Sequence, residues 1–496
     1  MRWAALLLGL LFSQQGLVAG TSAFERLKPG AGSGTTTLFV YDVPAKPFSL
    51  VNEVVPISLL LSRIDTRIVE KPAHQVTAKE IESADFLVVA GIAGLPKFSP
   101  AVRETLLASG KPILAIGGAS SLASGAAATS KSSSEPAESA GVEYRGMTRE
   151  SRLDPFFPGP NGAKDVLAAA RVSGKLRALV WREGNRFGFG TLPGGALLSM
   201  LFSDTLLDFF GVRDVPPSGM LFVVQDYHPG SDPAALRRLT DFFFASKTPF
   251  VVSARIDDVP GGGSVRMPRE VFLDSLRYAQ AHGARIVLGG SPQSEHIRTF
   301  LDANIIPLAL DSSVFMADGE PRTGTQPRFS TILGGIGTRR TPDGAPTGFP
   351  ANTVLSAGSD RIVIPLNVPV ANQPDAIVAM SECIRQISQL KAGIAGVPIP
   401  AWLPFQQMRD IVDGARGTGV PTLDLVDARN IVEGADVIIR TPPAGSAKSR
   451  GESPDKITLL DRHSRIFKPA DPGSADNPGD APQAAVEVIE RETGKQ

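Results

Sequence analysis

Two apolar runs in the middle of the chain are followed by residues that can carry chemistry. The runs Leu221 to Val224 and Phe250 to Ile256 predict neighbouring strands of a buried parallel sheet. Proteins of the α/β class place their chemistry at the carboxyl ends of such strands. The candidates at or near these ends are the acids Asp226, Asp257 and Asp258 and the side chains Tyr227, His228, Arg255 and Trp402, the last from a later strand.

Three kinds of site can be built from these residue types. Asp226 paired with Asp257 or Asp258 would cleave a glycosidic bond if the carboxyl groups lie roughly 5 to 9.5 Å apart. Asp226 and His228 form a weak candidate metal site, because two donors are fewer than a zinc centre needs. The rings of Tyr227 and Trp402, with polar groups beside them, suit a sugar ring in a preformed cleft.

The segment that links the two strands predicts one helix. Asp232 is suited to the N-cap and Pro233 to the first helical position, and apolar residues recur at helical spacing up to Pro249. Strand, helix and strand in this order favour a βαβ unit. Later strands are expected at Ile286 to Leu288 and, closing the sheet, at Val420 to Leu425.

The stretch VVQDYHPGSDPAALRRLTDFFFASKTPFVVS resembles the opening of a secreted, uncharacterised branch of the polysaccharide deacetylase superfamily. Members of that branch begin with a strand ending in two acids, then an Asp-Pro helix start and a strand introduced by Pro-Phe. The likeness extends from about residue 218 to 434. It implies a distorted (β/α) barrel that holds a divalent metal between an acid of the first strand and two His of an H-x-x-x-H motif, with a second acid as the general base.

The chain departs from this pattern at the residues that hold the metal. Asp226 takes the place of the metal-binding acid, but Gln225 stands where an acid is expected and cannot accept a proton near neutral pH. The segment Gly289 to Gln293 replaces the H-x-x-x-H motif without a His. Two later positions where the family carries His, after the strand that ends at Asp311 and in GVPIPAWLP, also lack it.

These departures predict a degenerate barrel that binds a polysaccharide or a cell-envelope glycan, without metal-dependent deacetylation and without a cofactor. Two alternatives stay open. One is an active polysaccharide hydrolase or deacetylase that uses Asp226 with Asp257 or Asp258. The other is a scaffold for exopolysaccharide assembly.

The N-terminus predicts export. Arg2 is followed by the apolar run Trp3 to Phe12 and then by small residues up to Ala23, as in a secretory signal peptide of residues 1–23. No later run approaches about 18 uninterrupted apolar residues, so no membrane span is expected once the signal is removed. A periplasmic or extracellular location follows.

The remaining sequence predicts two domains and a tail. Strands and helices alternate through residues 36–212, which favours a flavodoxin-like or amidotransferase-like parallel sheet, and Pro216-Pro217 separates it from the barrel at 218–434. The glycine-rich stretch from Gly184 to Gly195 is interpreted as a turn with Phe187 and Phe189 exposed. Residues 440–496 are rich in Pro, Gly, Ser and charge and predict a mostly disordered tail.

Charge balance and cysteine content limit the partners and the kinds of site that can be expected. Lys plus Arg and Asp plus Glu are both 50, so bulk charge gives no reason to expect nucleic acid. The single cysteine, Cys383, excludes an intramolecular disulfide and any multi-cysteine metal site. Its apolar neighbours at helical spacing predict that it packs as a small hydrophobic residue.

Overall fold

The structure is a computed structural model of the whole chain. It describes residues 22–42, 54–92, 94–124, 139–153, 155–256, 267–290, 292–312, 327–334, 339–340, 346–347, 355–356, 361–371, 374–428, 430–435, 437–441, 464–467 and 486–490. The candidate acids Asp257 and Asp258 lie outside these residues.

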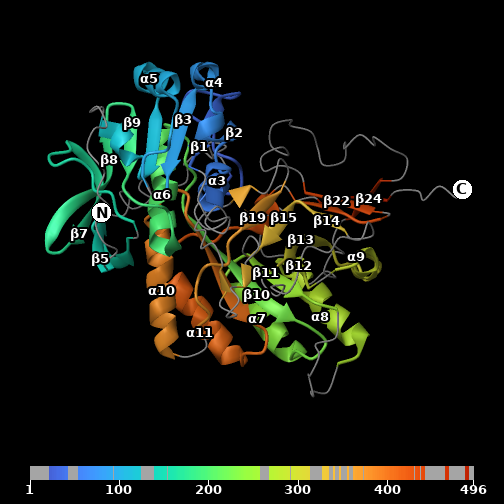
Figure 1. Cartoon of the computed structure of the whole chain (residues 1–496). Coiled ribbons are helices and arrows are strands. Elements are labelled where there is room, and N and C mark those ends of the chain that lie inside the picture. Colours follow the sequence, from blue (N-terminus) through green and yellow to red (C-terminus); the bar gives the residue numbers. More distant parts are fainter. Residues whose placement is uncertain are drawn as a thin grey trace, which may run out of the picture.

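The first half of the described chain forms a nine-stranded mixed sheet (Figure 1). The strands lie in the order β2-β1-β3-β4-β9-β8-β7-β5-β6, parallel from β2 to β9 and antiparallel from β9 to β6. Their bounds are β1 (Thr36–Tyr41), β2 (Arg67–Pro72), β3 (Phe86–Gly91), β4 (Ile113–Gly117), β5 (Ser139–Tyr144), β6 (Met147–Arg152), β7 (Asp165–Val172), β8 (Lys175–Glu183) and β9 (Arg186–Phe189).

Helices cover both faces of the parallel part of this sheet. Alternate residues of β3 face opposite sides, so Leu87 packs with α4 (Ala78–Ser83) and α5 (Pro100–Ala108), whereas Phe86 packs toward α3 (Val55–Leu61) and α6 (Gly195–Phe209). The ring of Phe86 lies 4.7 Å, centroid to centroid, from that of Phe210 at the end of α6. Helix α6 thus fixes the sheet to the rest of the molecule.

The second large sheet is nearly barrel-shaped, with seven parallel strands and one antiparallel edge strand among the described residues. The order is β18-β19-β15-β13-β12-β11-β10-β20. The bounds are β10 (Gly219–Tyr227), β11 (Phe250–Ala254), β12 (Ala284–Gly289), β13 (Pro307–Asp311), β15 (Thr331–Leu333), β18 (Leu355–Ser356), β19 (Ile362–Ile364) and β20 (Ile394–Pro400).

A side chain, rather than a strand ladder, joins the two ends of this sheet. Asn367, just beyond β19, donates from Nδ2 to the carbonyl oxygen of Ile394 (2.9 Å) and accepts at Oδ1 from the amide of Gly396 (3.0 Å). The amide of Val368 donates to the carbonyl oxygen of Gly396. Gly396 has to be glycine here, because a Cβ would lie 2.1 Å from the carbonyl oxygen of Pro365.

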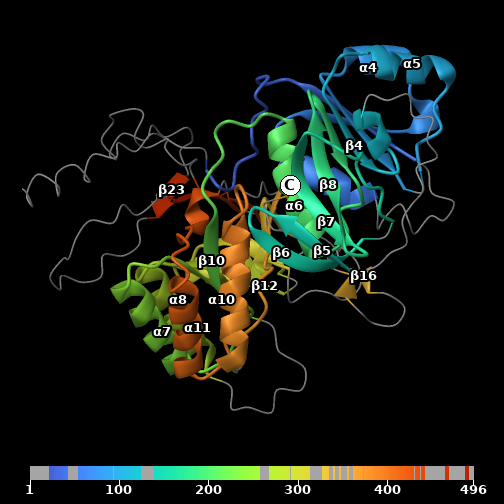
Figure 2. The ribbon, with the colours of Figure 1, turned by 90° about the vertical axis from the view of Figure 1, so that its left-hand side faces the viewer.

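Five helices of the described residues pack against the barrel, and Figure 2 shows α7, α8, α10 and α11 gathered on one side of it. The side chain of Asp232 caps α7 by accepting from the amide of Ala234, and Pro233 is its first residue, as predicted. The bounds are α7 (Pro233–Ala245), α8 (Arg269–Ala281), α9 (Ser294–Asp302), α10 (Pro374–Ser388) and α11 (Phe405–Arg416).

The barrel strands divide their residues between two apolar clusters. Outward residues such as Phe222 and Val252 join the large core beneath the helices. Inward residues form a separate narrow core, to which the barrel strands contribute Leu221, Val223, Val251, Val287, Ala309, Leu333, Ile364 and Ile394. Two-residue periodicity therefore decides which core each residue enters.

Smaller sheets lie beside the barrel. Strands β14 (Arg328–Phe329), β21 (Ile431–Glu433), β22 (Val437–Arg440), β24 (Val486–Glu490) and β23 (Ser464–Phe467) form a five-stranded sheet, and β16 (Arg339–Arg340) pairs with β17 (Pro346–Thr347). Two of these strands come from the range predicted as a disordered tail. No helix among the described residues has the length and apolarity needed to cross a bilayer.

The structure corrects two of the predicted elements. Phe187 and Phe189 are buried in β9, because this short strand pairs with β4 and lays both rings against α6. The expected strand from Val420 to Leu425 makes only an isolated bridge from Thr422 to Met220, so β20 and the seam at Asn367 close the barrel instead.

A buried carboxylate joins the nine-stranded sheet to the barrel. Asp204 of α6 has no exposed surface, and its Oδ2 accepts from the hydroxyl of Tyr144 (2.5 Å) while lying 3.2 Å from Nη1 of Arg145. Its Oδ1 accepts from the amide of Lys391 in the loop before β20. Burial raises the pKa of Asp204, and these partners oppose that effect.

The seam at Asn367 predicts a specific loss of stability. Asn367→Ala leaves the carbonyl of Ile394 and the amide of Gly396 without their side-chain partner, so the free energy of unfolding should fall by about 1–3 kcal/mol. Urea denaturation measures this fall. The matched control is Asn185→Ala, which removes one exposed hydrogen bond to the carbonyl of Gly110 and should change stability by less than about 1 kcal/mol. Equal losses in the two variants would show that the seam does not hold the barrel together.

Candidate functional site

The carboxyl end of β10 carries one extra residue, and that residue is Asp226. Val224 is opposite Val252 of β11, but Tyr227 is opposite Ala254, so three steps on β10 match two on β11. Asp226 has φ +57°, the left-handed region that a non-glycine residue enters at a cost. Bulges of this kind redirect side chains and occur beside active sites.

The bulge places Asp226 against a cation from the neighbouring strand. Nη2 of Arg255, one residue past β11, lies 2.9 Å from Oδ1 of Asp226. Both side chains are sheltered, with 16% of Arg255 and 34% of Asp226 exposed. Partial burial makes the attraction stronger than in a surface ion pair.

Two polar atoms of this pair still lack a hydrogen bond. Oδ1 of Asp226 and Nε of Arg255 are buried, and neither has a hydrogen-bond partner among the described residues. The ion pair brings the charges together without the alignment that a hydrogen bond needs. Buried groups in this state are costly unless water or a ligand satisfies them. The pair therefore contains one acceptor and one donor whose hydrogen-bonding capacity the described residues leave unused.

His228 is neutral and held in one tautomer. Its Nδ1 accepts a hydrogen bond from the amide of Gly230 (2.9 Å), and its own amide donates to Oγ of Ser231. Burial holds the pKa of His228 below its ordinary value; the charge of Asp226 opposes this shift and that of Arg255 adds to it. Because Nδ1 is the acceptor, the ring proton is on Nε2, which leaves this nitrogen a donor rather than a metal ligand.

Tyr227 does not face a ligand, in contrast to the prediction. The ring is 1% exposed and stacks on Phe272 of α8, with centroids 5.5 Å apart. Its hydroxyl lies 2.6 Å from Oγ of Ser275, and burial raises the pKa of Tyr227 to about 12. Tyr227 therefore packs between β10 and α8 and presents no surface to a ligand.

Trp402 lies at the end of the strand next to β10. It follows β20, where Pro400 is opposite Gln225 and the amide of Ala401 donates to the carbonyl of Gln225 (2.9 Å). The side chain is 66% exposed, which is unusual for so large an apolar group. An exposed indole at the barrel mouth is a stacking surface for a flat apolar ligand face.

Ser253 is a buried polar residue below the end of β11 that sequence reasoning missed. Its side chain follows Val251 on the inward face of β11, is fully buried, and has an Oγ without a hydrogen-bond partner in the described part of the chain. Gly289 of β12 leaves space beside it, because a Cβ there would lie 2.9 Å from Oγ. Period-two alternation from Val251 would have identified this residue. Asp311, at the end of β13, is buried on the same inward face.

The described residues do not fit the metal centre that the family resemblance implies. They contain no group of three or more His, Cys, Asp or Glu side chains that could hold a metal ion. His296 caps α9, where its Nδ1 accepts from the amide of Gln293, and His282 caps the end of α8. The carboxylate of Asp226 already has a guanidinium as its counter-ion.

Comparisons with known proteins give this chain no family. Neither a scan against models of protein families nor a search of curated proteins found a match. The likeness to polysaccharide deacetylases therefore rests on the residues of the chain itself.

The neutral state of His228 predicts a loss of stability in acid. The folded protein resists protonating this ring, so the contribution is fully present above the ordinary pKa of 6.5 and is lost as the unfolded chain takes up the proton at lower pH. His228→Asn keeps an acceptor near the position of Nδ1 but cannot titrate. Its urea midpoint should therefore fall less between pH 7.5 and 5.5 than that of the wild type.

His282→Asn is the matched control, since His282 lies at the end of α8 and its Nδ1 contacts the carbonyl oxygen of Tyr278 instead of an amide. A wild-type pH profile in His228→Asn would contradict the assignment of the acid sensitivity to this ring.

Proposed function

We propose that this protein is an exported, carbohydrate-associated protein whose barrel mouth binds a polysaccharide or cell-envelope glycan and does not perform metal-dependent deacetylation. The observation that carries the proposal is the ion pair between Asp226 and Arg255 at the ends of β10 and β11. The two residues supply both a charge balance and hydrogen-bonding atoms that a sugar can use.

Arg255 has the electrostatic role that a metal ion would have beside Asp226. A divalent cation would have to displace the guanidinium or share the carboxylate with it, and two cations at one carboxylate repel each other. His228 cannot compensate, because binding through Nε2 would require a proton on Nδ1 and the loss of the hydrogen bond from Gly230. Gly289 and Gln293 bring no imidazole.

The same pair is suited to sugar hydroxyl groups. A sugar hydroxyl can donate to the carboxylate of Asp226, because 34% of this side chain is exposed and a carboxylate accepts from several donors. Hydrogen bonds to charged groups contribute about 1.5–3 kcal/mol each. The exposed indole of Trp402 supplies an apolar face for the C–H side of a sugar ring.

The fold and the N-terminal sequence support the rest of the proposal. Seven parallel strands in a nearly closed sheet are consistent with a barrel of the polysaccharide deacetylase type, and the mixed sheet before it is consistent with a flavodoxin-like or amidotransferase-like domain. The apolar run near Met1 supports export, and with it a periplasmic or extracellular location.

Glycan binding should depend on Arg255 and Trp402. On a glycan array, Arg255→Ala and Trp402→Ala should each weaken binding to the recognised polymer by about tenfold or more, which corresponds to about 1.4 kcal/mol. Matched controls are Arg277→Ala on the exposed face of α8 and Phe244→Ala on α7, where 53% of the ring is exposed. Unchanged binding in both mouth variants, with folding retained, would rule out this site.

Metal should be neither tightly held nor used. After dialysis the purified protein should contain well under one equivalent of zinc, nickel or cobalt by elemental analysis. It should release no acetate from acetylated chitooligosaccharides when these metals are added. One tightly bound equivalent, lost together with acetate release in Asp226→Ala, would overturn the proposal.

A further inference from the structure

The floor of the barrel is closed by the first described residues of the chain. Phe24 is 3% exposed and belongs to the narrow inward core together with Leu221 of β10 and Leu425 from the loop beyond α11. Ser22 reaches the same loop, since its Oγ donates to the carbonyl oxygen of Asp427 (3.3 Å). In the described part of the chain, this end of the barrel is therefore filled by packing.

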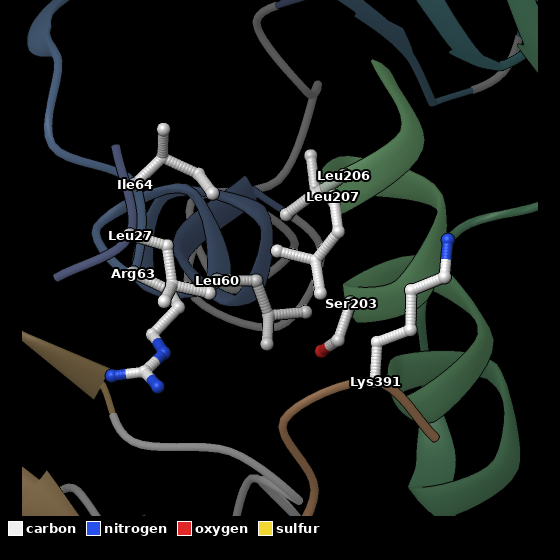
Figure 3. Close-up of a pocket in the computed structure, with 8 residues that line it drawn as sticks. All are labelled: Leu27, Leu60, Arg63, Ile64, Ser203, Leu206, Leu207 and Lys391. Atoms are coloured by element: carbon white, nitrogen blue, oxygen red, sulfur yellow. The ribbon is translucent and has the colours of Figure 1, made fainter. Parts of the chain in front are cut away.

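The cavity beside α3 and α6 is also filled by packing. Figure 3 shows Leu60 of α3 and Leu206 and Leu207 of α6 converging on it, with Lys391 at its side. It has about 10 Å³ for the centre of a small molecule, which is enough for one water molecule at most. A ligand as large as a sugar does not fit here.

The outer face of helix α7 carries arginines that lie on aromatic rings. Helix α7 packs between α8 and α11, and Figure 2 shows the three helices side by side. Three guanidinium groups cover rings of the neighbouring helix, with distances from Cζ to the ring centre of 4.2 Å for Arg237 on Tyr278, 5.3 Å for Arg238 on Phe405 and 5.6 Å for Arg409 on Phe242. All three arginines are exposed. We call them the arginine face.

Aromatic stacking prepares these groups for a planar anion. The rings of Phe242 and Phe405 are anchored in the large core, so the guanidinium that lies on each of them is held in place. Stacking uses the flat side of a guanidinium and leaves its N–H edge for hydrogen bonds. That edge matches a carboxylate, which accepts two parallel hydrogen bonds from it.

The protein's own carboxylates leave most of this capacity unused. Among the described residues, the two arginines of α7 contact rings and form no ion pair. Asp241 of α7 accepts from the hydroxyl of Tyr278 instead (2.5 Å). Nε of Arg409 lies 3.3 Å from Oδ2 of Asp413, but both side chains are about half exposed, and such a pair is weak. The arginine face therefore attracts a carboxylate from outside the protein.

The arginine face begins at the barrel mouth. Helix α11 starts at Phe405, just after the exposed Trp402, and α7 starts at Pro233 in the segment that follows His228. With 13 residues, α7 is about 20 Å long, so the face can contact several successive sugar units. A glycan chain that lies on Trp402 can continue past Phe405 onto Arg238.

We propose that the arginine face binds the carboxylate groups of an acidic polysaccharide, whose chain continues outward from the barrel mouth. The inference rests on the proposed glycan binding and narrows the ligand to a polymer of uronic-acid units. The equal numbers of acidic and basic residues in the chain, 50 each, give no long-range attraction to a polyphosphate such as nucleic acid. A carboxylate on each sugar unit matches separate guanidinium groups, each of which binds one planar anion.

Isothermal titration calorimetry with decamers of mannuronate and of galacturonate tests the proposal. The wild type should bind at least one of the two. Arg237→Gln/Arg238→Gln should weaken that binding by about tenfold or more, because two charged hydrogen-bonding groups are lost. Arg238→Lys keeps the charge without the planar fork, so it should weaken binding by about threefold or more.

The matched control is Arg298→Gln/Arg385→Gln, which removes the same charge from α9 and α10 and should change the affinity by less than about twofold. Melting temperatures of all these variants should stay within about 2 °C of the wild type, since the side chains are at the surface.

Three results would overturn the inference. These are no binding of either decamer by the wild type, equal losses in the double variant and its control, and equally tight binding of a single-stranded oligonucleotide, because the face would then respond to charge alone. Arg255→Ala separates the two proposals. Loss of glycan binding in this variant, with none in Arg237→Gln/Arg238→Gln, keeps the mouth and removes the arginine face, whereas the reverse pattern keeps the arginine face and removes the mouth.

Discussion

The single extra residue in β10 is the constraint on which the barrel mouth depends. Strict alternation from Leu221 and Val223 would point Tyr227 into the barrel. Because Asp226 takes up one position in left-handed geometry, Tyr227 turns outward to Phe272, and the carboxylate turns to Arg255. Strand β10 pairs with β20 without irregularity up to Gln225, so the distortion changes the register against β11 alone.

Much of the fold follows from sequence patterns. The apolar runs at β10, β11 and β12 and the capped helix α7 appear where the spacing of residues predicts them, since local periodicity and capping depend on nearby residues only. Strand β9 is different. Its short glycine-rich sequence reads as a turn, and it becomes a strand only because β4 and β8 pair with it on either side. Partners distant in sequence override local preference.

The sequence likewise predicts only part of the candidate site. Residue types at strand ends identify Asp226, Arg255, His228 and Trp402 as groups at the mouth, because parallel strands bring their carboxyl ends to one edge. The sequence does not reveal that Arg255 pairs with Asp226, that His228 is fixed by the amide of Gly230, or that Tyr227 is buried. The first and the third depend on a register shift of one residue, which side-chain composition does not encode, and the second depends on the turn that follows β10.

The contacts of Ser22 and Phe24 with the far end of the chain have a consequence for the order of folding. The hydrogen bond from Ser22 to Asp427 spans 405 residues, and the apolar neighbours of Phe24 come from strands that are made long after it. Contacts between residues so far apart in sequence form late in folding. The chain loses the entropy of closing the loop before these contacts stabilise it. The earliest described residues thus dock last, after α11 and the loop that follows it are complete.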